Sequence, residues 1–70
     1  ANRHLISDLG VAAVLADATA QTAAYSVRIN LRELGSPDLR LKIESDLDKT
    51  LERCAAGRVS LERFVKEVLE

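Results

Sequence analysis

The sequence has no tryptophan and no methionine, and it contains only one residue each of phenylalanine, tyrosine, proline, cysteine and histidine. With so few aromatic side chains, the core must be built from leucine, valine, isoleucine and alanine. A chain of 70 residues hides only about 60% of the surface that its unfolded form exposes. We therefore expect one small domain, marginally stable alone, that other chains complete.

Chemically active side chains are also scarce. The lone cysteine, Cys54, cannot form a disulfide within the chain, which favours a reducing compartment. The lone histidine, His4, has no cysteine or second histidine beside it, so the sequence predicts no metal site. There is no glycine-rich phosphate loop and no nucleophile elbow. The usual enzyme motifs are therefore missing.

The charge pattern excludes two further classes. The net charge is −1 and basic residues are interspersed with acidic ones, which argues against a nucleic-acid partner. Residues 9–31 are rich in apolar side chains, but Asp17, Gln21, Arg28 and Asn30 interrupt them, which argues against a membrane span. Residues 1–70 show no charged segment followed by an apolar run that would mark a signal peptide. We expect a cytoplasmic location.

A long helix is predicted over residues 8–34, after an irregular arm over residues 1–6. Ser7 suits its N-cap, Asp8 adds a carboxylate at the positive end of the helix dipole, and Gly35 suits a left-handed residue just after it. The helix is apolar on most sides, which predicts that it is buried. Alanines that allow close helix packing recur every fourth residue: Ala12, Ala16, Ala20 and Ala24.

Two more helices are predicted after the turn. Ser36 and Pro37 form an N-cap and first-turn pair, and the short link predicts that the helix over 37–56 lies antiparallel to the first. Its apolar stripe is Leu39, Ile43, Leu47, Leu51 and Cys54. Gly57 is expected to end it, and Ser60 to cap a short third helix over 61–70. The predicted fold class is all-α, with an alanine-rich buried helix and an amphipathic helix as an antiparallel hairpin, in a bundle completed by other chains.

Two narrow polar rows follow the first helix. Thr22, Ser26 and Asn30 lie on one side, and the residue types favour hydrogen bonds to backbone carbonyls one turn back. Asp17 and Arg28 lie on the opposite row, where a charge must be paired or solvated. An ion-pair network between helices is the favoured interpretation. The alternative is a polar cleft in which Arg28 binds a substrate carboxylate.

The residues also resemble those of a known family. The run Ser7-Asp8-Leu9-Gly10-Val11, followed by an alanine-rich helix that ends in Val27-Arg28-Ile29-Asn30-Leu31, resembles the C-terminal part of the formiminotransferase-cyclodeaminase and methenyltetrahydrofolate cyclohydrolase family. The resemblance covers residues 7–34 well and the following charged helix loosely. Ser26 stands where that family usually has Asn. The family's Pro-Gly-Gly-Gly-Ser loop and first helices have no counterpart in residues 1–70, so we expect the chain to be either a single helical domain or the last part of a larger one.

The resemblance implies an all-helical, commonly dimeric protein that acts on one-carbon tetrahydrofolates. The reaction would be opening of the methenyl bridge by water, or loss of ammonia from the formimino form. A tetrahydrofolate derivative would be the substrate, and no separate cofactor is implied. Asp8 would be the catalytic carboxylate near the reacting carbon. Ser7, Arg28 and Asn30 would position the pterin or the glutamate carboxylates.

A different class of function remains open from the residues themselves. A non-catalytic helical association module would use the same alanine-rich helix to pair with another copy or with a complementary helical chain. Both hypotheses predict an oligomer, because the long helix has more apolar surface than two amphipathic helices can cover.

Overall fold

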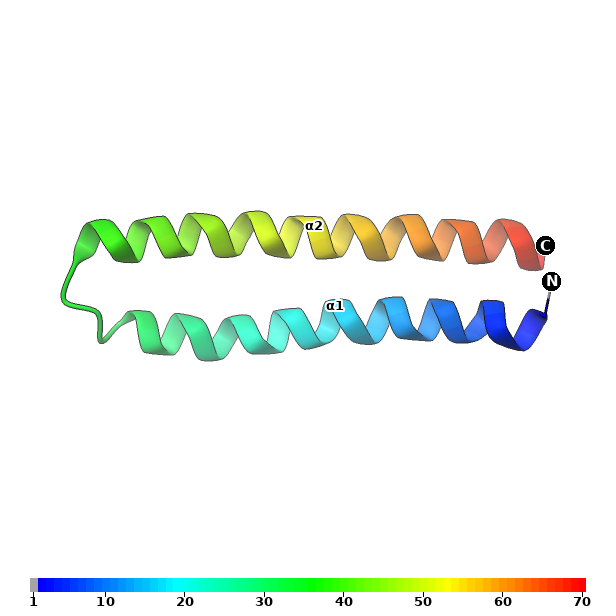
Figure 1. The fold of residues 1–70 in the computed structure, drawn as a ribbon, viewed down its shortest axis with the longest axis horizontal. Coiled ribbons are helices and arrows are strands. Elements are labelled where there is room, and N and C mark those ends of the chain that lie inside the picture. The colour runs from blue at the N-terminus through cyan, green and yellow to red at the C-terminus, as the bar shows by residue number, and fades with distance from the viewer. Residues whose placement is uncertain (1) are drawn as a thin grey trace.

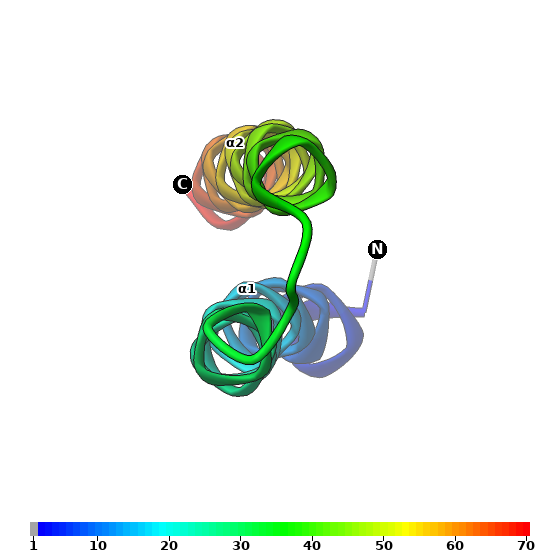
Figure 2. The ribbon, with the colours of Figure 1, turned by 90° about the vertical axis from the view of Figure 1, so that its left-hand side faces the viewer.

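The structure, a computed structural model, describes residues 2–70 and consists of two long helices. Helix α1 spans Arg3–Leu31 and helix α2 spans Pro37–Leu69. They lie side by side and antiparallel, so that Arg3 and Leu69 are at the same end of the hairpin (Figure 1). The view along the hairpin shows α1 and α2 side by side, joined by the turn (Figure 2), and the described residues form a rod measuring 52 × 16 × 11 Å. The all-α antiparallel hairpin is confirmed.

Helix α1 begins five residues earlier than predicted. Its N-cap is Asn2, whose side-chain Oδ1 accepts hydrogen bonds from the backbone N–H groups of His4 at 2.9 Å and Leu5 at 3.3 Å. Asparagine caps helices as well as serine does, and no helix breaker separates Asn2 from the predicted start. Ser7 and Asp8 therefore lie inside the helix, and the predicted arm is wrong over Arg3–Ile6. Residue 1 lies outside the described residues.

In the turn between the helices, the prediction for Ser36 and Pro37 is confirmed and the prediction for Gly35 is wrong. The amides of Arg32, Glu33 and Leu34 bond to carbonyls three residues back, at 3.1 to 3.3 Å, which tightens the end of α1. No described glycine has a positive φ, so the predicted left-handed Gly35 is wrong. Ser36 does cap α2, because its Oγ accepts the Leu39 amide at 3.3 Å, and Pro37 occupies the first turn.

Helix α2 is continuous where a break was predicted. It runs through Gly57 and Ser60 to Leu69, so the separate third helix is wrong. A glycine inside a helix costs only about 1 kcal/mol relative to alanine, and residues 38–69 contain no proline to enforce a stop. The apolar pattern predicted for the third helix instead continues the stripe of α2, with Leu61, Val65 and Leu69 half-buried.

The contact between the helices uses different residues of α1 from those predicted. Ala13, Asp17, Ala24 and Leu31 are buried, and Gly10 and Ala20 are half-buried. Opposite them lie half-buried residues of α2 that include Ile43, Leu47, Leu51 and Cys54, as predicted. A Cβ built on Gly10 would be 3.6 Å from the side chain of Val65, so the helices approach closely there.

The hairpin buries only part of the predicted alanine row, for a geometric reason. Ala12 and Ala16 are exposed, Ala20 is half-buried and only Ala24 is buried. Four residues turn an α-helix by about 400°, so a strict four-residue repeat drifts by about 40° at each step. The buried positions alternate steps of three and four residues, which keeps them facing a partner helix.

Much of the apolar surface stays uncovered in the hairpin. Leu5, Val11, Leu15, Tyr25 and Ile29 of α1 are all more than half exposed, so the helix is not buried by α2 alone. Such contiguous apolar surface is typical of an interaction face. The hairpin therefore has the surface of a chain that packs against other chains. Neither helix has the length and apolar character needed to cross a membrane.

Candidate functional site

One flank of the hairpin carries a continuous groove between the helices, which we call the flank groove. It consists of four successive hollows, each of which shares a lining residue with the next. The α1 wall includes Ser7, Val14, Asp17, Gln21, Tyr25 and Arg28. The α2 wall includes Asp48, Leu51, Ala55, Arg58, Glu62 and Lys66. These residues recur every three or four positions, as expected for one side of a helix.

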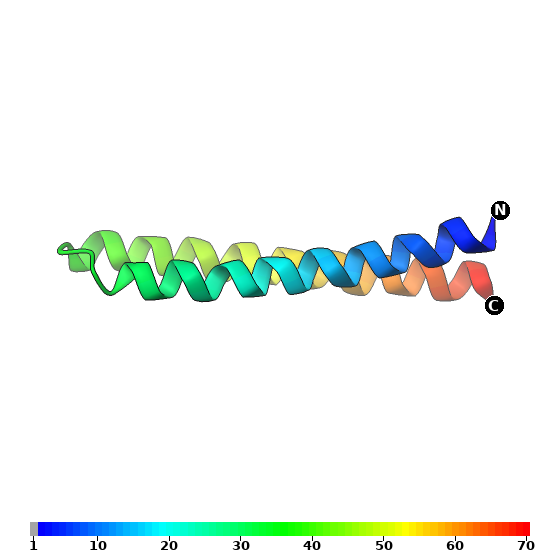
Figure 3. The ribbon, with the colours of Figure 1, turned by 90° about the horizontal axis from the view of Figure 1, so that it is seen from below.

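The groove changes character along its length. The hollow that contains Ser7 has a volume of about 460 Å³ and is mostly apolar, with Val11, Leu15 and Val65 in its walls. The next hollow, of about 450 Å³, has more polar side chains in its walls, Asp17, Gln21, Arg58 and Glu62, beside Val14, Ala18 and Tyr25, and we call it the polar hollow. In Figure 3, α1 passes in front of α2 and the two helices separate toward the end that carries the chain termini.

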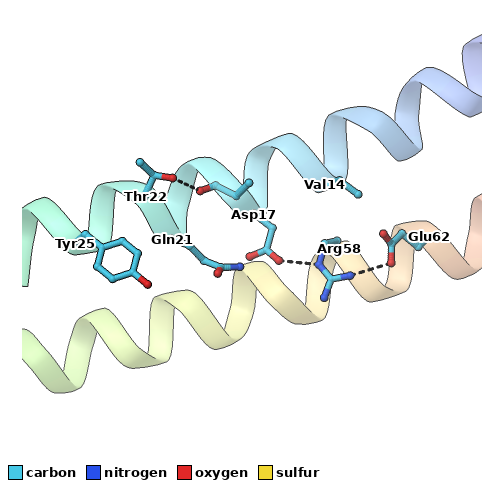
Figure 4. A pocket seen from close by; sticks show the side chains of 8 residues that line it. Val14, Asp17, Gln21, Thr22, Tyr25, Arg58 and Glu62 are labelled. Carbon is cyan, nitrogen blue, oxygen red and sulfur yellow. Dashed lines mark hydrogen bonds and ion pairs between the residues drawn. The ribbon is translucent and has the colours of Figure 1, made fainter.

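A charged triad lies at the centre of the groove. The Nε of Arg58 in α2 donates to Oδ2 of Asp17 in α1 at 2.7 Å, and its Nη1 donates to Oε2 of Glu62 at 2.9 Å (Figure 4). The hydrogen bond with Asp17 and the negative charge of Glu62 raise the pKa of the Arg58 guanidinium above its ordinary value. Arg58 is therefore a permanent cation.

Asp17 is unusual because it is a carboxylate in the contact between the helices. Its side chain is only 4% exposed, whereas that of Arg58 is 32% exposed. The second carboxylate oxygen, Oδ1, is buried and has no hydrogen-bond donor in the structure. Buried polar atoms nearly always have a partner, so this oxygen is an exception; Nε of Arg40 is another among the described residues.

Arg28 lies further along the same groove. Its Nη2 is 3.7 Å from Oδ1 of Asp48 in α2, and its guanidinium lies 5.8 Å from the centre of the Tyr25 ring. Both members of the ion pair are exposed, and such pairs contribute little to stability. The favoured prediction of ion pairs between the helices is confirmed for Asp17 and Arg28. Both residues also line the flank groove, and the alternative, that Arg28 binds a substrate carboxylate in a polar cleft, stays a prediction.

The four residues implied by the family resemblance fall in two places. Ser7 and Arg28 line the flank groove, whereas Asp8 and Asn30 are exposed on α1 and line none of its hollows. Asp8 and Asn30 are 22 residues apart, which places them within about 40° of each other around the helix. Twenty residues separate Asp8 from Arg28, a distance of about 30 Å along the axis. One small reacting group cannot contact both ends.

Sequence reasoning found Asp17 but missed its partners. Glu62 falls in the predicted third helix and Arg58 in the link before it, and the sequence leaves the docking of that helix open, so the prediction names no partner for Asp17. Their spacing of four residues, together with an acidic residue at the same level of the antiparallel helix, was the available signal. Thr22 behaves as expected, because its Oγ1 donates to the carbonyl of Ala18 at 2.8 Å. Among residues 2–70, no group of three or more histidine, cysteine or acidic side chains could hold a metal ion.

Comparison with known families agrees with the resemblance seen in the sequence. The family model described as formiminotransferase-cyclodeaminase matches residues 1–49, which include all of α1, the turn and the first part of α2. The chain belongs to the formiminotransferase-cyclodeaminase family. Searches of curated proteins and of solved structures give no match. Arg58 and Glu62 lie beyond the residues that the family model matches.

Proposed function

We propose that this chain is the C-terminal helical part of a folate one-carbon enzyme, of the methenyltetrahydrofolate cyclohydrolase or formiminotetrahydrofolate cyclodeaminase type. The observation that supports it is the family match, which spans Ser7-Asp8 and the Arg28-to-Asn30 segment together. The uncovered apolar surface of α1 agrees with a domain in which further helices complete the site.

In this proposal, Asp8 is the catalytic carboxylate. Both candidate reactions pass through an electron-poor carbon between two folate nitrogens, and a fixed negative charge stabilises such a centre. Asp8 is exposed on the surface of α1 that α2 leaves open, so a ligand held by another helix can reach it. Ser7, one residue earlier, borders the apolar end of the flank groove, where a ring system fits.

Arg28 and Asn30 take a different role because of their distance from Asp8. About 30 Å along α1 is longer than a tetrahydrofolate with a single glutamate. We therefore assign Arg28 and Asn30 to binding of a carboxylate, at a point of the assembled protein other than the reacting carbon of the same copy. Guanidinium geometry suits that role, since two parallel N–H groups match the two oxygens of a carboxylate.

The test measures opening of the methenyl bridge by the loss of methenyltetrahydrofolate absorbance, for the chain alone and mixed with a helical half that carries the Pro-Gly-Gly-Gly-Ser loop. We expect turnover with the mixture and a fall of about 10²-fold or more for Asp8→Asn, the range for a positioned acid or base. Asp46→Asn, an exposed carboxylate on α2, is the matched control and should keep full activity. No turnover in either sample, or full activity of Asp8→Asn, would overturn the proposal.

A second candidate function, a non-catalytic association module, is favoured by the exposed apolar residues of α1. Both proposals predict assembly with a second copy or a complementary helical chain. Leu15→Glu, at a position that is 60% exposed on α1, should weaken that assembly, because a charge placed in an apolar contact lacks a partner. Leu41→Glu, at a 64% exposed position of α2, should not. Sedimentation at micromolar concentration distinguishes the two variants. A wild-type chain that sediments as a folded monomer would contradict the assembly, and assembly without turnover would favour the module.

A further inference from the structure

The polar hollow of the flank groove contains an unfilled hydrogen-bonding position. Asp17 is 4% exposed, and of its two carboxylate oxygens only Oδ2 has a donor, the Nε of Arg58. The other, Oδ1, is buried without one. Leaving a buried charged acceptor unpaired is unfavourable. A ligand that donates a hydrogen bond to Oδ1 would therefore bind with a favourable free energy.

The charges around the hollow determine which ligand charge it favours. Asp17 and Glu62 are acidic and Arg58 is the single base among the residues that line it, which leaves a net charge of −1. An anion would meet two carboxylates, whereas a cation compensates the remaining charge. A metal ion is disfavoured because the guanidinium of Arg58 already binds both carboxylates.

The neighbouring side chains indicate which shape of cation the hollow accepts. Figure 4 shows Asp17, Gln21 and Tyr25 directed from α1 toward α2, while Arg58 and Glu62 extend toward each other along α2 and Arg58 meets the carboxylate of Asp17. Tyr25 and Val14 border the same hollow, and the Tyr25 ring also lies 5.8 Å from the guanidinium of Arg28. A flat cation suits such a hollow better than a compact ammonium group, because it donates several N–H bonds in one plane and tolerates stacking with a neighbouring guanidinium or aromatic ring.

We propose that this hollow is a binding site for a planar guanidinium or amidinium group, whose N–H donors pair with Oδ1 of Asp17. Gln21, which is exposed and lies beside the carboxylate in Figure 4, rotates to admit it. The site does not rest on the folate function, because Arg58 and Glu62 lie outside the residues that the family model matches.

The test titrates the full chain with benzamidinium chloride and follows the backbone and side-chain resonances of Asp17, Gln21 and Tyr25. We expect saturable shifts at these residues and none with neutral benzamide at the same ionic strength. Asp17→Asn should weaken binding about tenfold or more, as loss of a charge-assisted hydrogen bond predicts. Asp46→Asn, at an exposed carboxylate of α2 that lines none of the four hollows, should bind as the wild type does.

A second variant and a second ligand complete the experiment. If Asp17→Asn fails to fold, Glu62→Gln replaces it, because that change removes one negative charge and retains the pair between Asp17 and Arg58; it too should weaken binding. N-acetylarginine amide, tested in parallel, shows whether an arginine side chain of a polypeptide is also accepted. Shifts that do not saturate, equal binding to the variant, or no response to either cation would overturn the proposal.

Discussion

The two helices of the hairpin are built from different residues, and they bury different fractions of their apolar side chains. Helix α2 has one half-buried stripe of large aliphatic side chains, and its outer face carries mostly charged side chains with a few exposed apolar ones such as Leu41 and Phe64. Helix α1 presents small side chains to α2, with Ala13 and Ala24 buried, and keeps exposed leucine, isoleucine and valine side chains on its other sides. Small residues against large ones allow the two backbones to approach closely.

This difference indicates that α2 is an outer helix and α1 an inner one. A helix with a single apolar stripe needs one contact surface, and α2 finds it on α1. A helix that is apolar on several sides needs more than one neighbour, and α1 has only α2 in the hairpin. The likeness to the formiminotransferase-cyclodeaminase family extends over all of α1 but ends within α2, at residue 49.

The largest expected effect concerns the one charge that breaks this pattern. Arg58→Met leaves the carboxylate of Asp17 buried and unpaired, which typically destabilises a protein by several kcal/mol. Asp17→Leu should cost little or stabilise, because the partly exposed guanidinium of Arg58 can still reach water and Glu62. Urea unfolding followed by circular dichroism at 222 nm measures both.

Arg28→Met is the matched control for that comparison. Its ion pair with Asp48 is exposed on both sides, so the loss should stay below about 1 kcal/mol. If Arg58→Met proves as mild as Arg28→Met, the carboxylate of Asp17 is solvated in solution and the contact between the helices is looser than the structure shows.

A smaller effect is expected from filling the contact between α1 and α2. Ala24 is 1% exposed, so Ala24→Leu should overpack the contact and cost about 1–3 kcal/mol. Ala16→Leu, on the same helix at an exposed position, should leave the unfolding midpoint of the hairpin unchanged. Thermal unfolding of the two variants compares the buried and open sides of α1 directly. Equal losses would mean that Ala16 also packs against a neighbour in solution.

The sequence predicts the class of fold and one of its turns, and it fails where a weak local signal competes with packing. Ser36 and Pro37 mark the start of α2 correctly, because a capping hydroxyl and a fixed φ act locally. Gly57 was taken as a helix end, but a preference of about 1 kcal/mol yields to a stripe of half-buried leucines that continues on either side of it.

The candidate site shows the same limit. Asp17 could be recognised as a charge in need of a partner, because its position among buried residues follows from the spacing of the helix. Its partner could not, since the predicted break at Gly57 removed Arg58 from the helix that faces Asp17. The roles of Asp8, Ser7, Arg28 and Asn30 come from the family resemblance and remain proposals. That Arg28 and Asn30 lie about 30 Å from Asp8 follows directly from the rise per residue of the helix.

The smallest expected effect separates the two glycines that were predicted to end helices. Gly57 lies inside α2 and a Cβ there meets no atom within 4 Å, so Gly57→Ala should stabilise the hairpin by about 0.5–1 kcal/mol. Gly35 lies in the turn, has no positive φ and is equally open, so Gly35→Ala should be tolerated with a change below about 0.5 kcal/mol. Thermal unfolding of both variants measures the difference. A loss of stability in Gly57→Ala would mean that α2 breaks at this residue in solution, and a large loss in Gly35→Ala would mean that the turn adopts the left-handed conformation after all.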